Sequence, residues 1–590
     1  MGRYQKAAAL AVLAAFTFII YSNTLNGPFV FDDGLYIVKN PQIQNPSLLW
    51  PPSTRYLAYL SFALNYAWGG LDTFGYHLFN LAVHIANSAL VFALALLVFK
   101  TSALKGRGLE EYALPTALIA SFLFAAHPVQ TQAVSYITQR LASLAALFYL
   151  LSLVLYLKWR TTDAGGRAFI YIAALLAAVA AQFTKEIGFT LPVVILLAEL
   201  AFFRGAGRPG KRFAAIAPFL LTMAIVPALL FGPELSAGAD PGVSENIRAH
   251  QMRDLTMVSS HDYMATQSRV MVTYLRLLVL PVGQNIDYGY SFFTSFLAPE
   301  VLFSSILVTA VFGLGVFLFI RGLKGRSAHA LVAGYGILFF FIAISVESSI
   351  IPIKDVIYEH RLYLPNAGAA VFFAAMLMGL FDVLKKRFAL KVPALVWAIV
   401  MTIILAAPLA AAAWSRNNLW NDEVLLWRDA VAKSPANARA RNNLGTGLYL
   451  KGLRAEGMAE FKKAVSLDAS FADARYNLGN AYKDMGFIED AIKEFDAAVR
   501  LDPLKLSARN NLGLAYYSAG SYGKAVGQFE ALLVLAPSNY RARNSLGLAY
   551  LKMGRPEEAA SEFRAALAIN PGFEDALLNL NEVELEKGRE

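Results

Sequence analysis

The sequence contains no cysteine, and only 16% of its 590 residues are charged. The absence of cysteine excludes disulfides, thiolate metal sites and a cysteine nucleophile. An average soluble domain is roughly 25% charged, so the low charge content excludes an ordinary soluble protein for most of the chain. The sequence also lacks a basic stripe interleaved with aromatic residues, and it therefore gives no indication of nucleic-acid binding.

Apolar residues make up 57% of the chain and are unevenly distributed. Residues 1–414 hold nearly all the long apolar runs and the whole net charge of +10. Residues 415–590 have the composition of a soluble helical sequence, with 23 Lys+Arg and 23 Asp+Glu. We therefore predict an all-α protein in two domains, a polytopic membrane domain over 1–414 and a helical domain over 415–590.

The apolar runs predict about 11 membrane spans, because roughly 20 apolar residues are needed to cross a lipid bilayer. The expected spans are 7–21, 76–99, 113–126, 133–157, 168–184, 187–203, 213–231, 300–320, 328–346, 364–381 and 392–413. No convincing cleavage site follows the first run, so we interpret it as a span and not as a signal peptide. The polar loop between Gly232 and Gln267 is suited to covering a site.

Basic residues mark one side of these spans. They fall near the N-terminus and in alternate linkers, at Arg3, Lys6, Lys100, Lys105, Arg107, Lys158, Arg160, Arg167, Arg204, Arg208, Lys211, Arg212, Arg321, Lys324, Arg326, Lys385, Lys386, Arg387 and Lys391. By the positive-inside rule this side is cytoplasmic. The first outer loop (22–75) and residues 415–590 are then expected on the opposite side of the bilayer.

An aspartate pair, Asp32-Asp33, follows the first span. Ionisable groups at a membrane surface are costly to hold there and are candidates for a functional site. We predict that the pair is catalytic, with Asp32 as the base and Asp33 orienting the acceptor, or with these roles reversed. The alternative is that the pair caps a turn, which the sequence Asp-Gly favours. Two adjacent carboxylates can also hold a divalent cation.

Three more polar clusters lie at the outer ends of expected spans. They are His127 before Pro128 together with Gln139-Arg140, then Lys185-Glu186, and then Glu359-His360-Arg361. Carboxylates beside cationic groups suit the transfer of a sugar from a phosphate. A carboxylate accepts the proton of the incoming hydroxyl, and cations stabilise the charge that develops on the phosphate.

We assign phosphate binding to the cationic members of these clusters and supporting roles to the others. The predicted phosphate-binding residues are Arg361, His360, Arg140 and Lys185, and the supporting residues are Glu186, His127 and Glu359. Simpler alternatives exist for each. Arg361 and His360 can be snorkelling residues at the interface, Arg140 and Lys185-Glu186 can form a structural ion pair, and His127 can mark the end of a span.

The second domain repeats every 34 residues. The repeated positions include Asn-Leu-Gly at 443–445, 477–479 and 511–513, Ser-Leu-Gly at 545–547, and Phe461, Phe495, Phe529 and Phe563. This is the period and signature of the tetratricopeptide repeat, a helix-turn-helix unit that stacks into an α-solenoid. We predict four full repeats over about 438–571, a half unit around Trp427 before them, and a closing helix around 579–581.

Four asparagines occupy equivalent positions of these repeats, at Asn443, Asn477, Asn511 and Asn579. An asparagine amide can both donate to and accept from a peptide backbone, so the set is predicted to bind an acceptor peptide. The arginines Arg439, Arg475, Arg509 and Arg543 are expected near the same face. The alternative is that the amides join neighbouring repeats.

In their order along the chain, these motifs resemble a known family. Residues 1–414 resemble the C-type glycosyltransferase fold, and the whole chain resembles the tetratricopeptide-containing transmembrane O-mannosyltransferase-like family in a bacterial version. The resemblance is carried by Phe31-Asp32-Asp33, His127-Pro128-Val129 with Gln139-Arg140, Lys185-Glu186, the segment His360-Arg361-Leu362-Tyr363-Leu364-Pro365 and the repeats.

The resemblance implies an inverting transfer of one sugar, mannose or another hexose, from a polyprenyl-phosphate donor to Ser or Thr of an exported protein. It further implies that the acidic pair carries the base, that no metal cofactor is required, and that the repeats recruit the acceptor. The implied location is the bacterial inner membrane, with the active site and the repeats in the periplasm. Two alternatives remain open: a lipid or polysaccharide acceptor, and a non-catalytic scaffold anchored in the membrane.

Overall fold

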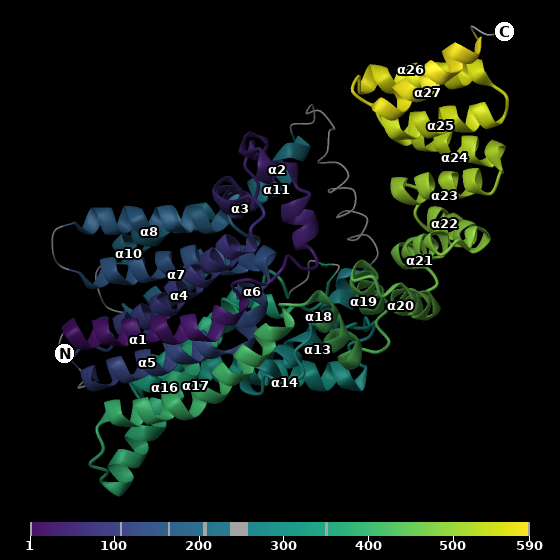
Figure 1. Cartoon of the computed structure of the whole chain (residues 1–590). Coiled ribbons are helices and arrows are strands. Elements are labelled where there is room, and N and C mark those ends of the chain that lie inside the picture. Colours follow the sequence, from purple (N-terminus) through teal and green to yellow (C-terminus); the bar gives the residue numbers. More distant parts are fainter. Residues whose placement is uncertain are drawn as a thin grey trace. The chain divides into compact units, whose positions relative to one another are not determined.

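The computed structural model describes residues 3–106, 109–162, 166–203, 209–235, 258–348, 352–353 and 355–587, and every regular element in these ranges is a helix (Figure 1). The predicted all-α class is therefore confirmed. Most of the expected polar loop between Gly232 and Gln267 lies outside the described residues, as do three of the expected basic residues, Arg107, Arg204 and Arg208.

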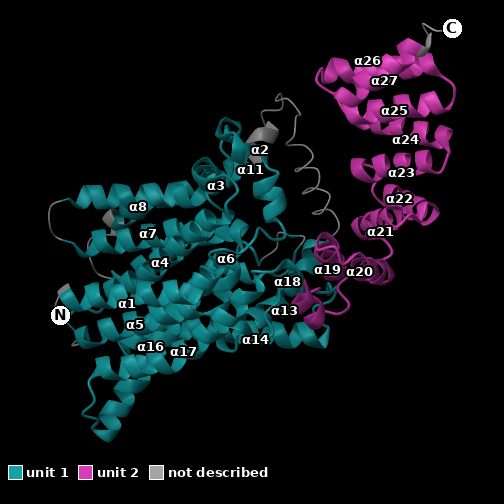
Figure 2. Ribbon diagram, viewed as in Figure 1, with its two compact units in different colours: residues 1–286, 290–426 teal, residues 287–289, 427–590 magenta. Residues whose placement is uncertain are grey.

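The chain divides into two compact units, coloured separately in Figure 2. Unit 1 comprises residues 1–286 and 290–426, and unit 2 comprises residues 287–289 and 427–590. The boundary falls within α18 (Glu423–Lys433), slightly beyond the boundary at 414 that the composition predicts.

The helices of unit 1 are mostly long and apolar. They are α1 (Arg3–Tyr21), α4 (Thr73–Val98), α5 (Glu110–Ala126), α7 (Arg140–Thr161), α8 (Arg167–Gln182), α9 (Leu191–Phe202), α10 (Pro209–Thr222), α11 (Ile225–Leu235), α14 (Pro299–Leu323), α15 (Ala328–Ile344), α16 (Pro365–Phe388) and α17 (Ala394–Leu419). Four others are short or less apolar, namely α2 (Pro41–Gln44), α3 (Tyr56–Gly69), α6 (Thr131–Val134) and α13 (Ser260–Val279).

Seven helical stretches of the described chain are long and apolar enough to cross a membrane, and they identify a membrane protein. They are Tyr4–Thr24, Thr73–Val98, Ile137–Thr161, Arg212–Leu230, Pro299–Leu323, Pro365–Phe388 and Ala394–Leu419. The remaining expected spans are present as helices that are bent or shorter. The run at 113–126 belongs to a pair bent by 52°, α8 and α15 are shorter apolar helices, and the run at 187–203 contains only the 12-residue α9.

Packing between the helices of unit 1 depends on small residues. α15 packs against both α14 and α16. A Cβ atom at Gly336 of α15 would lie 2.6 Å from the carbonyl oxygen of Gly368 in α16, so only glycine allows this approach. Membrane helices use such contacts because lipid provides no hydrophobic force for their association. The contact holds the end of α15 beside the start of α16, where several site residues lie.

The first outer loop folds onto the ends of the long helices. Ile37, Ile43 and Phe62 are fully buried together with Tyr76 of α4 and Ile137 at the start of the α7 span. This small core fixes the loop, including the aspartate pair, against unit 1.

Unit 2 consists of paired helices. The pairs are α19 (Ala438–Leu450) with α20 (Arg454–Leu467), α21 (Ala472–Asp484) with α22 (Ile488–Leu501), α23 (Leu506–Ser518) with α24 (Tyr522–Leu535), and α25 (Tyr540–Lys552) with α26 (Pro556–Ile569), followed by α27 (Glu574–Lys587). The repeated glycine leaves room for the ring of the repeated phenylalanine. A Cβ at Gly479 would lie 2.7 Å from the ring of Phe495, which is fully buried in the same repeat.

Candidate functional site

The two aspartates of the first outer loop face different surroundings. Phe31 before them adopts a left-handed backbone with φ of 51°, which costs a non-glycine residue about 1–2 kcal/mol. Asp33 is fully buried and accepts hydrogen bonds from the backbone N–H groups of Val30 (3.0 Å) and Thr138 (2.8 Å) and from the Thr138 hydroxyl. Asp32 instead lines a pocket.

Burial sets the protonation of Asp33. Burial raises its pKa from 3.8 to about 7, the charge of Asp32 acts in the same direction, and the hydrogen bonds from Thr138 and Val30 oppose the shift. Adjacent carboxylates titrate as a pair. A proton on Asp33 removes the repulsion between the two carboxylates.

The pocket has a volume of about 1030 Å³ and lies within unit 1. Its charged and polar lining includes Asp32, Arg55, Gln139, Lys185, Glu186, Glu347, Asp355, His360 and Arg361. Its apolar lining includes Val193, Val226, Pro227, Leu230, Phe312, Phe341 and Ile342. The pocket therefore joins a charged region to an apolar wall, and that wall is built largely from the helices that could span a membrane.

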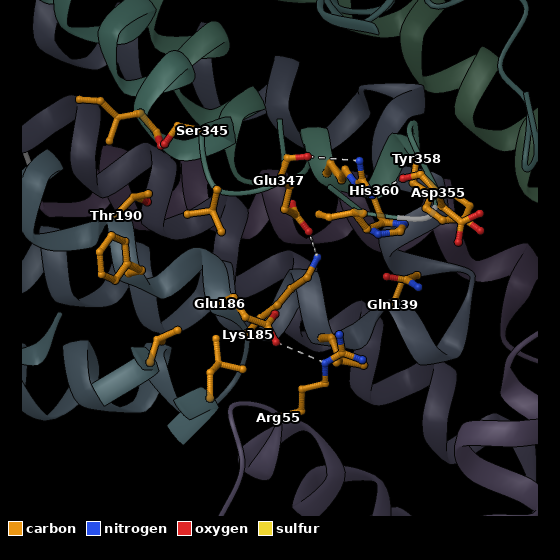
Figure 3. A pocket seen from close by; sticks show the side chains of 18 of the residues that line it. Arg55, Gln139, Lys185, Glu186, Thr190, Ser345, Glu347, Asp355, Tyr358 and His360 are labelled. Atoms are coloured by element: carbon orange, nitrogen blue, oxygen red, sulfur yellow. Dashed lines mark hydrogen bonds and ion pairs between the residues drawn. The ribbon is translucent and has the colours of Figure 1, made fainter. Parts of the chain in front are cut away.

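Two ion pairs lie inside the charged region (Figure 3). Lys185 Nζ is 2.6 Å from Glu347 Oε1, and Arg55 Nε is 3.6 Å from Glu186 Oε1. The Thr54 hydroxyl also donates to Glu186 Oε1 at 2.9 Å. Burial tends to raise the pKa of Glu186, but the charge of Arg55 and the hydrogen bonds together lower it, so the carboxylate stays ionised.

Arg361 closes one side of the pocket. Its guanidinium donates to the backbone carbonyls of Glu347 (3.3 Å), Asp355 (2.5 Å) and Val356 (3.0 Å). These bonds hold together the chain between α15 and α16, and the residue is only 3% exposed. A fixed guanidinium is a suitable partner for a phosphate, because its planar donors match phosphate oxygens.

His360 stands beside Arg361 as a neutral ring. It stacks on Tyr358 with ring centroids 5.1 Å apart, and its backbone N–H donates to Gln132 at 2.7 Å. Burial, followed by the charges of Lys185 and Arg361, lowers the pKa of His360 well below its usual value. His360 can therefore offer a hydrogen bond to a ligand but no positive charge.

Arg140 does not line the pocket. Its guanidinium is fully buried, lies 4.5 Å from the centre of the Phe62 ring and 4.4 Å from that of Phe79, and its donors bind protein oxygens. Its partners are the side-chain oxygens of Asn80 (2.6 Å) and Asn65 (2.6 Å), both oxygens of Ser61, and the carbonyl oxygen of Tyr76. The structure places Arg140 where it ties the first outer loop to α4 and α7.

His127 and Glu359 also lie away from the pocket lining. The Nε2 atom of His127 is 3.2 Å from the carbonyl oxygen of Leu278 at the end of α13. Glu359 accepts hydrogen bonds from the Asn285 backbone N–H (2.7 Å) and from the Gln284 amide (2.6 Å). His127 contacts the end of α13, and Glu359 holds the chain that follows this helix.

Three charged pocket residues were not singled out from the sequence, namely Arg55, Glu347 and Asp355. Arg55 directly precedes α3 in the first outer loop. Glu347 directly follows the expected span at 328–346, and a charged residue at an outer span end is the same signal that identified Lys185. Asp355 precedes the predicted cluster at 359–361 by a few residues.

In unit 2 the asparagine side chains bond across neighbouring repeats. The amide nitrogens of Asn477, Asn511 and Asn579 donate to the side-chain oxygens of Asn442 (2.9 Å), Asn480 (2.7 Å) and Asn544 (2.9 Å), respectively. The Asn443 amide nitrogen is buried with no hydrogen-bond partner in the described part of the chain. Asn477 also lines a small pocket of about 230 Å³ together with Tyr449 and Lys483.

The repeated arginines join the two helices of one repeat. Arg441, Arg475 and Arg543 each lie 2.9 Å from a glutamate of the second helix, at Glu460, Glu494 and Glu562, respectively. The residue in register with Arg475 and Arg543 is Arg441 and not Arg439. Arg439 lies two positions earlier and pairs with Asp287 at 2.6 Å.

The fold and the pocket together define a membrane protein with tetratricopeptide repeats and a charged cavity bordered by apolar helices. A tetratricopeptide-repeat family model matches residues 476–540 and 519–574. Protein O-mannosyl-transferase F38B6.6 of Caenorhabditis elegans is 26% identical over 79% of this chain and 64% of its own length. Protein O-mannosyl-transferase TMTC4 of Mus musculus is 25% identical over 75% of this chain and 64% of its own.

These matches confirm the resemblance to the tetratricopeptide-containing O-mannosyltransferase-like family. The chain spans about 64% of the length of these two relatives. Among solved structures, a crystal structure of the MamA protein is 30% identical over 25% of this chain and 81% of that chain, with a TM-score of 0.24.

Proposed function

We propose that the chain is a membrane glycosyltransferase that moves a single hexose from a polyprenyl-phosphate donor to Ser or Thr of an exported protein. The pocket carries the proposal, because it brings Asp32 and three cationic side chains to the edge of an apolar wall. The names of the two relatives as protein O-mannosyl-transferases support the same class of reaction, with mannose as the first sugar to test.

The two parts of a lipid-phosphate donor match the charged region and the apolar wall of the pocket. The prenyl chain would lie against the apolar wall, which includes Leu230 of α11 and Phe312 of α14. The phosphate would bind between Lys185 and Arg361, with His360 donating a hydrogen bond. A lipid phosphate suits this arrangement because its tail remains in the hydrocarbon region while its charge meets fixed donors.

In the proposed reaction Asp32 accepts the proton of the acceptor hydroxyl. The hydroxyl oxygen forms a bond to the anomeric carbon on the face opposite the phosphate. The bond from that carbon to the phosphate oxygen breaks, its electron pair leaves with the phosphate, and the configuration inverts. Lys185 and Arg361 stabilise the charge that develops on the phosphate. Removal of a general base of this kind slows a reaction by about 10²–10⁴-fold.

The acceptor is proposed to bind unit 2. The small pocket beside Asn477 and the asparagines of the repeats offer amides to an extended peptide backbone. We place the protein in the bacterial inner membrane, with the charged pocket and unit 2 on the periplasmic side. The basic linkers support this orientation. Each one connects two helices at one end, and the charged pocket residues come from the other ends of these helices. By the positive-inside rule, the end with the basic linkers is the cytoplasmic one.

The test is mass spectrometry of exported proteins from strains that carry wild-type protein, no protein, Asp32→Asn or Asp72→Asn, at matched membrane levels. Asp72 lies in the same outer loop and caps α4, where it accepts from the Phe74 N–H at 3.1 Å, and asparagine caps equally well. We expect hexose on Ser or Thr peptides to disappear without the protein and with Asp32→Asn, and to persist with Asp72→Asn.

Other outcomes would identify the alternatives. Intact glycopeptides together with sugar lost from an extracted lipid or polysaccharide would indicate a different acceptor. A phenotype of the deletion strain that Asp32→Asn fully restores would indicate a scaffold. Transfer by purified protein in the presence of a chelator tests the divalent cation, and the proposal expects no loss.

A further inference from the structure

Glu347 is a pocket residue for which the proposed transfer supplies no role. The residue is 8% exposed, and one of its carboxylate oxygens, Oε1, pairs with Lys185 at 2.6 Å. Its other oxygen, Oε2, is buried and has no hydrogen-bond partner among the described residues. A buried carboxylate oxygen without a donor is unfavourable, so its retention in a pocket calls for a partner that the ligand brings.

The position of Glu347 is fixed by its backbone. Its carbonyl oxygen accepts hydrogen bonds from the Arg361 guanidinium (3.3 Å) and from the Tyr263 hydroxyl of α13 (2.9 Å). The residue follows the C-terminus of α15, at Ile344, where the helix dipole disfavours an anion. The backbone contacts therefore do not require a carboxylate here, and the ion pair with Lys185 uses only Oε1, which leaves Oε2 for a ligand.

The chemistry of the free oxygen limits what can bind it. An ionised carboxylate only accepts hydrogen bonds, and a phosphate diester is also an acceptor, so the two cannot pair directly. A sugar hydroxyl can donate. The acceptor hydroxyl is already directed to Asp32 in the proposed reaction, which leaves the hydroxyls of the donor hexose.

We propose that Glu347 is the residue that recognises the donor sugar, with Oε2 accepting a hydrogen bond from a hydroxyl of the hexose. Its Oε1 pairs with Lys185 (Figure 3). Because Lys185 is proposed to bind the phosphate, a single carboxylate would set the spacing between sugar and phosphate. This inference rests on the proposed function, because it assumes a lipid-phosphate hexose as donor.

Recognition of the sugar can be tested apart from recognition of the phosphate by comparing two lipids, one with the sugar and one without it. Binding of undecaprenyl phosphate and of undecaprenyl-phosphate mannose is measured with the full-length protein in lipid nanodiscs. The variant Glu347→Gln keeps an oxygen for Lys185 but presents an amide N–H₂ where the sugar hydroxyl would donate. We expect it to weaken binding of the mannosylated lipid by about tenfold to hundredfold and to leave the bare lipid within about twofold.

Two further variants serve as controls for this measurement. Lys185→Gln is expected to weaken both lipids, and Asp72→Asn is expected to change neither. Equal weakening of both lipids by Glu347→Gln would show that Glu347 acts only through Lys185, and no weakening would show that it contacts neither ligand. Either result overturns the inference while leaving the proposed donor in place.

A measurement on the wild-type protein covers the case in which Glu347→Gln fails to fold. Undecaprenyl-phosphate mannose is replaced by analogues that each lack one ring hydroxyl. One analogue is expected to bind about tenfold more weakly or worse, and equal binding of all analogues would overturn the inference. Failure of the wild-type protein to bind either lipid would overturn the proposed function, and the inference with it.

Discussion

The carboxylate of Asp33 lies 2.8 Å from the backbone nitrogen of Thr138, while its neighbour Asp32 lines the pocket. The bond joins the first outer loop to the start of the α7 span, across 105 residues of chain. It allows the loop to hold Phe31 in its unfavourable conformation and to direct Asp32 outward. One aspartate of the pair therefore positions the loop, and the other lines the pocket.

The first prediction concerns stability and pH. Burial raises the pKa of Asp33 from 3.8 to about 7, so between about pH 4 and pH 7 the folded chain holds a proton that the unfolded chain has released. Stability must then fall as the pH rises through this window and level off above it. We expect the melting temperature of the purified protein to fall by roughly 5 °C across the window, and Asp33→Asn to flatten the profile.

Asp72→Asn serves as the control for this experiment, because it replaces an exposed carboxylate of the same loop and should keep the wild-type slope. A profile of Asp33→Asn that is as steep as that of the wild type would show that another group carries the pH dependence.

The repeats of unit 2 could be predicted from the sequence because each repeated residue is required by packing or backbone conformation within its own repeat. The glycine of α21 makes room for a phenylalanine of α22 in the same repeat, and Gly486 between these helices has a positive φ of 84°. Such constraints recur at every repeat, so the period reveals them. The expected spans were likewise visible as apolar runs, although several form helices too short or too bent to satisfy a simple length rule.

The site was predicted less completely, because sequence indicates the side of a membrane on which a residue lies but not its depth in the packed structure. Arg140 and Lys185 were both predicted at outer helix ends. Arg140 is enclosed by partners from the first outer loop and α4, whereas Lys185 lines the pocket. Glu347 was overlooked for a related reason. It also stands at the end of an expected span, but its pairing with Lys185, 162 positions earlier in the chain, cannot be read from the sequence.

The second prediction tests the position of Arg140. Arg140→Met removes a buried guanidinium and leaves the side chains of Asn65 and Asn80 without a donor. We expect a loss of about 1–3 kcal/mol in stability for each amide oxygen left without a donor, measured as a lower melting temperature. Folded protein, stabilised at low temperature, should bind undecaprenyl-phosphate mannose as well as the wild type does. A selective loss of donor affinity at unchanged stability would instead return Arg140 to the phosphate site.

The third prediction concerns the connection between α8 and α9 that carries Lys185 and Glu186. A Cβ at Gly188 would lie 2.7 Å from the backbone of Ala181, so Gly188→Ala must push this connection away from α8. We expect it to destabilise the protein by about 1–3 kcal/mol and to weaken donor binding through displacement of Lys185. Gly313→Ala in α14 is the matched control, because a Cβ there has nothing within 4 Å. Unchanged donor affinity in Gly188→Ala would show that Lys185 is not needed at its present position.

The fourth prediction separates the two roles considered for the asparagines of unit 2. Asn477 and Asn579 each donate one hydrogen bond of 2.9 Å to the preceding repeat, but only Asn477 lines the small pocket. Asn477→Ala and Asn579→Ala should therefore reduce stability by a similar amount, about 1 kcal/mol each. If the pocket receives the acceptor peptide, only Asn477→Ala should also lower the affinity of the full-length protein for that peptide. Equal affinities in the two variants would mean that the asparagines serve only to join the repeats, and that the acceptor is recognised elsewhere.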